Sequence, residues 1–194
     1  METIFSKIYE HNVWNNNDSN VPLSGPGSSL ENTKIFRQFL EATIDKYDIK
    51  SVIDLGCGDC TWIPTTKTFS IDYMGIDIVE SVINKNITKY GNKFVHGNII
   101  EMEIPKGDLF IIRDVIFHMK LDNILKLFNN IKDKFKYIMI TSCINLKNKD
   151  QLDDKYHYTE VNLNIEPFNK TKYLDIIYEK EFSRNVILYE SINF

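Results

Sequence analysis

Residues 52–59 read Val-Ile-Asp-Leu-Gly-Cys-Gly-Asp, an apolar run that ends in an acid and continues into a Gly-x-Gly turn. Such a run predicts a buried strand that stops abruptly. Because Gly56 and Gly58 lack a Cβ atom, a ligand can approach the backbone of this turn closely. The next apolar run ends at Asp77, which matches the interval of about 20 residues between a nucleotide-binding glycine turn and the acid that holds ribose hydroxyls. Together these features predict a site for an adenosine-containing cofactor.

The glycine pattern distinguishes between adenosine cofactors. The dinucleotide fingerprint Gly-x-Gly-x-x-Gly is incomplete, because Thr61 stands in the place of its last glycine. The other adenosine cofactor bound by this architecture is S-adenosylmethionine, which has no phosphate and needs backbone groups and an acid for its amino acid end. We expect that acid to be Asp54 or Asp59. The turn that contacts the cofactor would comprise Gly56, Cys57, Gly58 and Asp59.

Length and charge limit the classes of function. A chain of 194 residues predicts one domain spanning 1–194, with an N-terminal lid or cap segment at 1–27 and a substrate-shaping insertion at 143–172. The net charge of −4 gives no support for a nucleic-acid-binding surface. There is no apolar run long enough to cross a bilayer and no secretory signal pattern, so we expect no membrane insertion and a cytoplasmic location.

Cysteine spacing raises a second interpretation of the glycine turn. Cys57 and Cys60 form a Cys-x-x-Cys pair, which is also typical of redox and zinc sites. A zinc site needs further ligands, and apart from this pair the sequence holds Cys143 and four scattered histidines. Aspartates and a histidine also gather around residues 150–157, where a solvated acidic loop is the commoner arrangement. We therefore expect no metal.

Apolar periodicity predicts strands that alternate with helices. The strand runs are 51–55, 73–76, 94–96, 109–112 and 137–141, and the helical runs begin at 28, 79 and 121, the last ending at 135. Ser28 and Glu31 form a capping-box pattern. Two runs, 173–181 and 185–191, predict a C-terminal hairpin. Near-continuous apolar strands are typical of a parallel sheet that is covered on both faces. We therefore predict a Rossmann-like α/β fold with a mostly parallel seven-stranded sheet, a C-terminal antiparallel hairpin and helices on both faces.

Ligands of open α/β sheets lie beyond the carboxyl ends of the strands, so the residues there are the candidates. After the second strand, Asp77 can accept both ribose hydroxyls and Ile78 can pack on the adenine. After the third, Asn98 can accept a hydrogen bond from the adenine amine, with Ile99 beside it. A plain turn residue is the alternative interpretation of Asn98.

The segment after the fourth strand, Arg113-Asp-Val-Ile-Phe-His118, begins where the reacting group of the cofactor would face a substrate. His118 follows Asp114 by four residues, which predicts that they share a face if the segment is helical. A carboxylate beside an imidazole suits a general base. The candidate catalytic residues are therefore His118, Asp114 and Arg113, with Arg113 also on the cofactor side. A structural Arg–Asp pair and a histidine at a helix start are the alternatives.

Two polar segments are candidates for substrate contact. The insertion at 143–172 holds Tyr156, His157 and Tyr158, and long loops at this edge of a sheet shape specificity. The turn Ser24-Gly-Pro-Gly-Ser-Ser leads into a predicted helix, where Ser24 can contact the cofactor carboxylate or a phosphorylated substrate. Its glycines would also allow the N-terminal segment to hinge as a lid.

The combination of Ser-Gly-Pro-Gly-Ser-Ser, Asp-Leu-Gly-Cys-Gly-Asp, Tyr-Met-Gly-Ile-Asp-Ile, Arg-Asp-Val-x-x-His and Val-Asn-Leu-x-x-x-Pro-Phe resembles small bacterial class I S-adenosylmethionine-dependent methyltransferases. The resemblance covers the chain from about Trp14 and implies the class I methyltransferase sheet. It also implies transfer of a methyl group to oxygen or nitrogen of a small polar acceptor, with S-adenosylhomocysteine as product. Sugars and phosphorylated or amino-alcohol precursors of surface polysaccharides are the acceptors it suggests. Cys60 departs from the pattern, since many members have a third glycine there.

Two other functions remain open from the sequence. A non-catalytic cofactor-binding subunit would need no base, so changes at His118 and Asp114 would leave its complex active. A protein or RNA methyltransferase is the other alternative, and the acidic net charge disfavours RNA. The Asn/Asp-Pro-Pro-Tyr/Phe motif of many amide-nitrogen methyltransferases is not matched by Arg113-Asp-Val-Ile. The expected partner is a small-molecule acceptor, and the oligomeric state stays open.

Overall fold

The computed structural model describes residues 2–150 and 158–194. The described residues divide into two compact units, 2–98 and 99–194, the second without residues 151–157. The strand order is β3-β2-β1-β4-β5-β7-β6 in a seven-stranded sheet, which agrees with the predicted Rossmann-like α/β fold. Among the described residues, no helix has the length and apolar character needed to cross a membrane.

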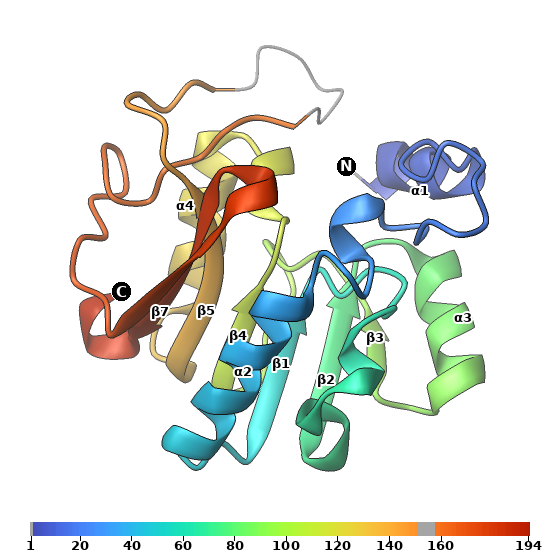
Figure 1. Ribbon diagram of the computed structural model, residues 1–194, viewed down its shortest axis with the longest axis horizontal. Helices are drawn as coiled ribbons and strands as arrows, with labels where there is room; N and C mark the ends of the chain where they lie inside the picture. Colours follow the sequence, from blue (N-terminus) through green and yellow to red (C-terminus); the bar gives the residue numbers. More distant parts are fainter. Residues whose placement is uncertain (1, 151–157) are drawn as a thin grey trace. The chain divides into compact units, whose positions relative to one another are not determined.

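The first unit is a parallel three-stranded arrangement with helices (Figure 1). Its strands are β1 (Ser51–Leu55), β2 (Asp72–Asp77) and β3 (Phe94–His96), and β2 lies between the other two. The helices are α1 (Glu2–Glu10), α2 (Lys34–Lys46) and α3 (Glu80–Tyr90), with short 3-10 turns at Pro26–Ser28, Ile63–Thr65 and Lys67–Ser70. β1 and α3 follow the sequence pattern closely. Gly91 ends α3 with a φ of 84°, as expected for a glycine stop.

The second unit combines parallel and antiparallel pairing. β4 (Gly107–Ile112) runs parallel to β5 (Phe135–Cys143), and β5 pairs antiparallel with β7 (Arg184–Glu190). β6 (Asp175–Glu179) completes the predicted C-terminal hairpin with β7. A 3-10 turn (Ile116–His118) and α4 (Leu121–Ile131) connect β4 to β5. β5 extends two residues past its predicted end, because Ser142 and Cys143 still pair with β7.

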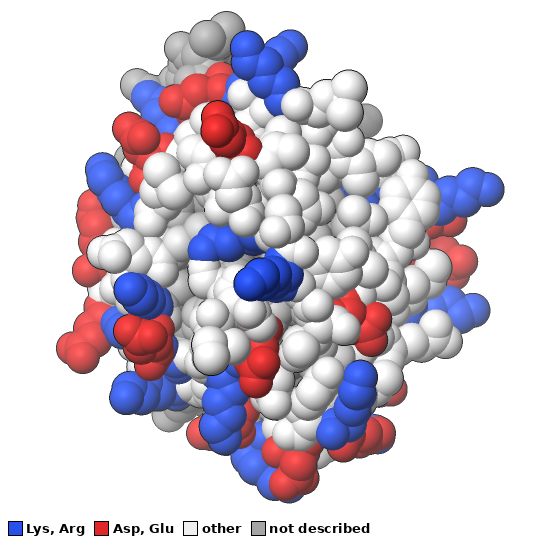
Figure 2. Space-filling view, turned by 90° about the vertical axis from the view of Figure 1, so that its left-hand side faces the viewer, with Lys and Arg blue, Asp and Glu red and all other residues white. Residues whose placement is uncertain are grey.

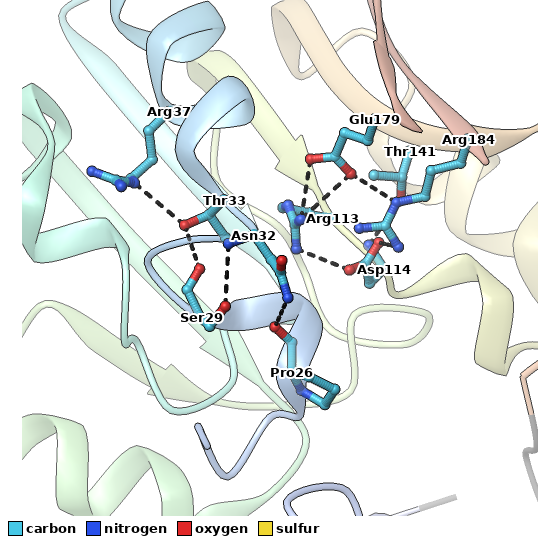
Figure 3. Close-up of polar contacts among 10 residues, drawn as sticks. All are labelled: Pro26, Ser29, Asn32, Thr33, Arg37, Arg113, Asp114, Thr141, Glu179 and Arg184. Atoms are coloured by element: carbon cyan, nitrogen blue, oxygen red, sulfur yellow. Dashed lines mark hydrogen bonds and ion pairs between the residues drawn. The ribbon is translucent and has the colours of Figure 1, made fainter. Parts of the chain in front are cut away.

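Two helix predictions were wrong at their ends. The helix predicted from Ser28 begins at Lys34, and the capping box does not form: Asn32 and Thr33 instead bond to Ser29 in a turn that precedes the helix (Figure 3). The second helix, α4, ends at Ile131, four residues before its predicted end. The chain turns toward β5 there, and Asp133 in this turn has a φ of 62°. In α4, Leu127 is buried, whereas Leu125 is 41% exposed.

Candidate functional site

The glycine turn after β1 is joined directly to Asp77 at the end of β2, both in the first unit. The Gly58 N–H donates to Asp77 Oδ2 at 2.9 Å, and the Val79 N–H donates to Oδ1 at 3.0 Å. A carboxylate oxygen accepts more than one hydrogen bond, so the same oxygens can receive ribose hydroxyls. Burial raises the pKa of Asp77, and the bonds from Val79 and Gly58 oppose that rise. The turn thus holds this carboxylate in one orientation.

The backbone N–H groups of the turn are engaged within the unit. Those of Gly56 and Cys57 both donate to the carbonyl oxygen of Ile76, at 2.7 and 3.1 Å. The Asp59 N–H donates to Ser24 Oγ at 2.9 Å, and the Cys60 N–H points to the Cys57 oxygen at 3.4 Å. Since its N–H groups already have acceptors, the turn offers oxygen atoms rather than N–H donors to a ligand, which suits an ammonium group.

The two acids proposed for that ammonium differ in their surroundings. Asp54 is buried in β1 and accepts a hydrogen bond from the hydroxyl of Tyr73 at 3.0 Å. Asp59 is half-buried and accepts one from the Ser24 N–H at 3.2 Å and another from the Thr61 hydroxyl at 2.9 Å. Asp59 is therefore the more accessible of the two carboxylates.

Cys60 adopts a φ of 54°, which lies in the left-handed region. Glycine takes this conformation without the steric cost of a Cβ atom, so this backbone would also suit the glycine that the sequence resemblance leads us to expect here. The Cys60 side chain is 1% exposed. The residue thus keeps the turn that a glycine would form and adds a buried thiol to it.

The N-terminal segment is docked on this turn. Ser24 Oγ lies 2.8 Å from the hydroxyl of Tyr9, besides accepting the Asp59 N–H. A Cβ atom at Gly58, whose φ is 55°, would lie 2.3 Å from Ser24 Oγ. The close approach that requires glycine at 58 is therefore made by the protein's own N-terminal segment. Ser24, predicted as a substrate-binding residue, has its hydroxyl against Asp59 and Tyr9.

Two further residues support the turn and were missed from the sequence. Asn86 on α3 is buried, and its Nδ2 donates to the Gly58 carbonyl at 2.8 Å. A polar side chain on the apolar stripe of α3 was the signal that would have found it. Tyr9 packs with Val79 and Val82, and Ile78 lies against the same cluster.

The remaining predicted cofactor residues lie where the two units divide in the sequence. Asn98 is the last residue of the first unit and is half-buried. Ile99 is the first residue of the second unit and is buried, and its carbonyl accepts a hydrogen bond from Asn130 Nδ2 at 2.9 Å. The structure thus gives each a defined place, one after β3 and the other anchored to α4.

In the second unit, four charged residues form a closed network (Figure 3). Arg113 donates to Asp114 Oδ2 at 2.9 Å and to Glu179 Oε1 at 3.2 Å. Arg184 donates to Glu179 Oε2 at 2.8 Å, and its Nη1 lies 2.6 Å from Asp114 Oδ1. Two guanidinium groups are thereby neutralised by two carboxylates. The side chains of Arg113, Glu179 and Arg184 are buried, whereas that of Asp114 is 26% exposed.

The backbone at Asp114 is strained. Its φ is 62°, and its N–H donates to Thr141 Oγ1 at 2.9 Å. The 3-10 turn that contains His118 starts only at Ile116. The segment from Asp114 to His118 is therefore not a continuous helix, so the condition under which these two residues would share a face is not met. A strained residue in a buried charged network at a strand end is a feature that recurs at functional sites.

His118 lies beside one of the predicted substrate residues. The rings of His118 and Tyr158 have centroids 6.3 Å apart, and Tyr158 also packs on Phe117 at 5.2 Å. The Tyr158 hydroxyl lies 3.2 Å from Cys143 Sγ, and burial raises the pKa of Tyr158. Tyr156 and His157, predicted with it, fall outside the described residues.

The cysteines and acids give no metal site in the described part of the chain. Over residues 2–150 and 158–194, no group of three or more His, Cys, Asp or Glu side chains has an arrangement that could hold a metal ion. Cys57, Cys60 and Cys143 are free thiols. Burial raises the pKa of each of them, which is the opposite of what a reactive or metal-binding thiolate needs.

No protein-family model and no curated protein matches this chain. Its structure is similar to that of an S-adenosylmethionine-dependent methyltransferase from Clostridium acetobutylicum ATCC 824, with a TM-score of 0.63, 14% identity and coverage of 96% of this chain and 97% of that one. A protein from Pyrococcus horikoshii OT3 matches with a TM-score of 0.60 and 17% identity over 84% and 92% of the two chains.

A third match is the O-methyltransferase from a Brevibacillus brevis trans-AT PKS multienzyme, solved with S-adenosyl-L-homocysteine. Its TM-score is 0.53 and its identity 18%, over 66% of this chain and 47% of that one. At these identities the likeness concerns the fold. The chain has the fold of S-adenosylmethionine-dependent methyltransferases, as the sequence resemblance implied.

Proposed function

We propose that this protein is an S-adenosylmethionine-dependent methyltransferase that acts on oxygen or nitrogen of a small polar acceptor. The observation that carries the proposal is the 2.9 Å bond from the Gly58 N–H to Asp77, which joins a glycine turn to the acid at the end of the next strand. The methyltransferase fold supports it independently of these two residues.

The residues of the first unit fit the proposed cofactor. Asp77 would accept the ribose hydroxyls, and Ile78 would pack on the adenine. Asn98 would accept a hydrogen bond from the adenine amine, and Ile99, the first residue of the second unit, follows it in the sequence as an apolar residue. Because the N–H groups of the turn are engaged and Asp59 is half-buried, the ammonium of the cofactor would meet carboxylate and carbonyl oxygens. These hydrogen-bond acceptors suit the hydroxyl groups of an uncharged sugar and a cation, and they do not suit a phosphate, which needs donors.

The chemistry asked of the remaining residues is modest. S-adenosylmethionine, when bound, would supply the methyl group from its sulfonium, which is already a strong electrophile. Positioning of the acceptor then supplies much of the rate. A hydroxyl or ammonium acceptor must also lose a proton, and we propose that His118 is the general base that accepts it. Asp114 is the weaker base candidate, because both of its oxygens contact guanidinium groups. Asp114 and Arg113 would instead orient polar groups of the acceptor.

Surface charge supports a small acceptor over a nucleic acid. On the face drawn in Figure 2, basic and acidic side chains are interspersed around an uncharged area, and neither sign forms a continuous patch. Nucleic-acid binding uses basic stripes, and the net charge is −4. Sugars, phosphorylated sugars and amino alcohols, including precursors of surface polysaccharides, are the acceptors to screen first.

The test is release of S-adenosylhomocysteine from S-adenosylmethionine in the presence of a panel of these acceptors. We expect turnover with at least one acceptor, and a drop in kcat of about 100-fold or more for His118→Gln. His11→Gln, at an exposed position in the first unit, is the control and should keep full activity. Cofactor binding without turnover on any acceptor, alone or with a partner protein, would contradict a catalytic role.

A further inference from the structure

The N-terminal segment, of which residues 2–27 are described, is held to the glycine turn by a reciprocal pair of hydrogen bonds. The Ser24 N–H donates to Asp59 Oδ2 at 3.2 Å, and the Asp59 N–H donates to Ser24 Oγ at 2.9 Å. Each residue is therefore both donor and acceptor to the other across 35 positions of sequence. Such a pair fixes the distance between the two chain segments that it joins, and their relative orientation.

Tyr9 extends this contact into the interior of the segment. Its hydroxyl lies 2.8 Å from Ser24 Oγ, and its ring packs edge-on to Trp14 with centroids 5.4 Å apart. Burial raises the pKa of Tyr9, and the nearby Asp77 carboxylate adds to the rise, so the hydroxyl stays neutral. With Ser24 Oγ accepting from Asp59, the Tyr9 hydroxyl completes a chain from α1 to the turn.

The same turn also contacts Asp77, through a hydrogen bond from Gly58. Asp59 follows Gly58, whose N–H is the donor to the Asp77 carboxylate. A shift of Ser24 would release the Asp59 N–H and the space above Gly58, where the two residues approach each other most closely. The conformation that orients Asp77 is thus linked to the docked position of the N-terminal segment.

We infer that Tyr9 and Ser24 are positioning residues for cofactor binding: they hold the N-terminal segment closed on the glycine turn, so that docking of the segment and binding of the cofactor strengthen each other. This inference rests on the proposed function. The coupling is reciprocal by thermodynamic necessity, because a cofactor that favours the closed turn must also favour the docked segment.

Other contacts anchor the segment, so loss of one hydroxyl leaves a folded protein. Phe5, Trp14 and Leu23 pack with Ile78 around the buried residues Tyr9, Val79 and Val82. Glu2 also lies 3.3 Å from His96 Nε2, which hydrogen-bonds to the Ile78 carbonyl oxygen at 3.0 Å. Tyr9→Phe keeps the ring and these contacts and removes a single oxygen atom. It isolates the hydrogen bond from the packing.

The first measurement is the affinity for S-adenosylhomocysteine by isothermal titration calorimetry. One hydrogen bond of this kind is worth about a factor of 3–10 in affinity, so we expect Tyr9→Phe and Ser24→Ala to bind the product that much more weakly. Tyr178→Phe, which removes a hydroxyl from a half-exposed side chain on β6, should bind as the wild type does. Thermal midpoints without ligand verify that all three variants are folded.

The second measurement is amide hydrogen exchange over residues 2–27 with and without S-adenosylhomocysteine. Ligand should slow exchange in this segment of the wild-type protein, and less so in Tyr9→Phe. Unchanged affinity of both variants, or exchange in the segment that ignores the ligand, would overturn the inference. Failure of the wild-type protein itself to bind would instead reject the proposed cofactor, so the two failures are distinguishable.

Discussion

The Gly58 N–H and the Asp77 carboxylate lie 2.9 Å apart and join the turn after one strand to the end of the next. The bond fixes the carboxylate that the proposed cofactor needs. Ser24 lies against the same glycine from the side of the N-terminal segment. Gly58 is therefore the residue at which cofactor orientation and segment docking meet, and it is the first position to change.

Gly58→Ala should weaken binding of S-adenosylhomocysteine by at least about tenfold, because the new Cβ atom would lie 2.3 Å from Ser24 Oγ and force the segment away. Gly91→Ala is the matched control: it also has a positive φ, of 84°, but its Cβ atom would meet nothing within 4 Å. Both variants should also lose stability from backbone strain, which at the φ of 84° and ψ of −171° of Gly91 amounts to about 1–3 kcal/mol. Equal affinities of the two variants in calorimetry would refute the role of the contact.

Glu179→Ala should destabilise the protein by about 3–5 kcal/mol, because it leaves two buried guanidinium groups with only Asp114 as a counter-charge. Glu179 is 2% exposed and bonds to both Arg113 and Arg184. The control, Glu181→Ala, lies two residues away at an exposed position and should change stability by no more than about 0.5 kcal/mol. Urea unfolding followed by circular dichroism gives both values. A small loss for Glu179→Ala would mean that water enters the network.

The three thiols should react slowly with a disulfide reagent in the native protein at pH 8. Burial raises the pKa of Cys57, Cys60 and Cys143. A raised pKa lowers the fraction of reactive thiolate. The labelling rate should therefore keep rising with pH above 8.5, and denaturant should expose all three groups. A fast native reaction that levels off below pH 8 would instead favour the redox interpretation of the Cys57–Cys60 pair.

The sequence predicted those parts of the fold that depend on neighbouring residues. The strand before the glycine turn and the stop of α3 at Gly91 follow from local apolar runs and from glycine itself. The start of α2 was not predicted correctly, because the Thr33 hydroxyl donates to the Ser29 carbonyl oxygen in a turn that precedes the helix. Similarly, the left-handed φ of Asp114 removed the helical spacing expected between it and His118.

The candidate site was predictable where one residue implied the next. Gly58 and Asp77 were both predicted as cofactor-binding residues from their spacing in the sequence, and a hydrogen bond joins them in the structure. The contacts that support them join distant positions: Ser24 meets Asp59 across 35 residues, and Arg113 meets Glu179 across 66. No periodicity encodes such pairs, because they form only when separate elements pack.

Titration of the wild-type protein with S-adenosylhomocysteine, with NAD as a second ligand, tests the central claim most directly. We predict binding of S-adenosylhomocysteine alone. Asp77→Ala should weaken it about 100-fold, since two hydrogen bonds to a charged group are lost. Asp72→Ala, at the exposed start of the same strand, should leave it unchanged. Absence of S-adenosylhomocysteine binding to the wild-type protein, or equal affinities of the Asp77 and Asp72 variants, would contradict the account.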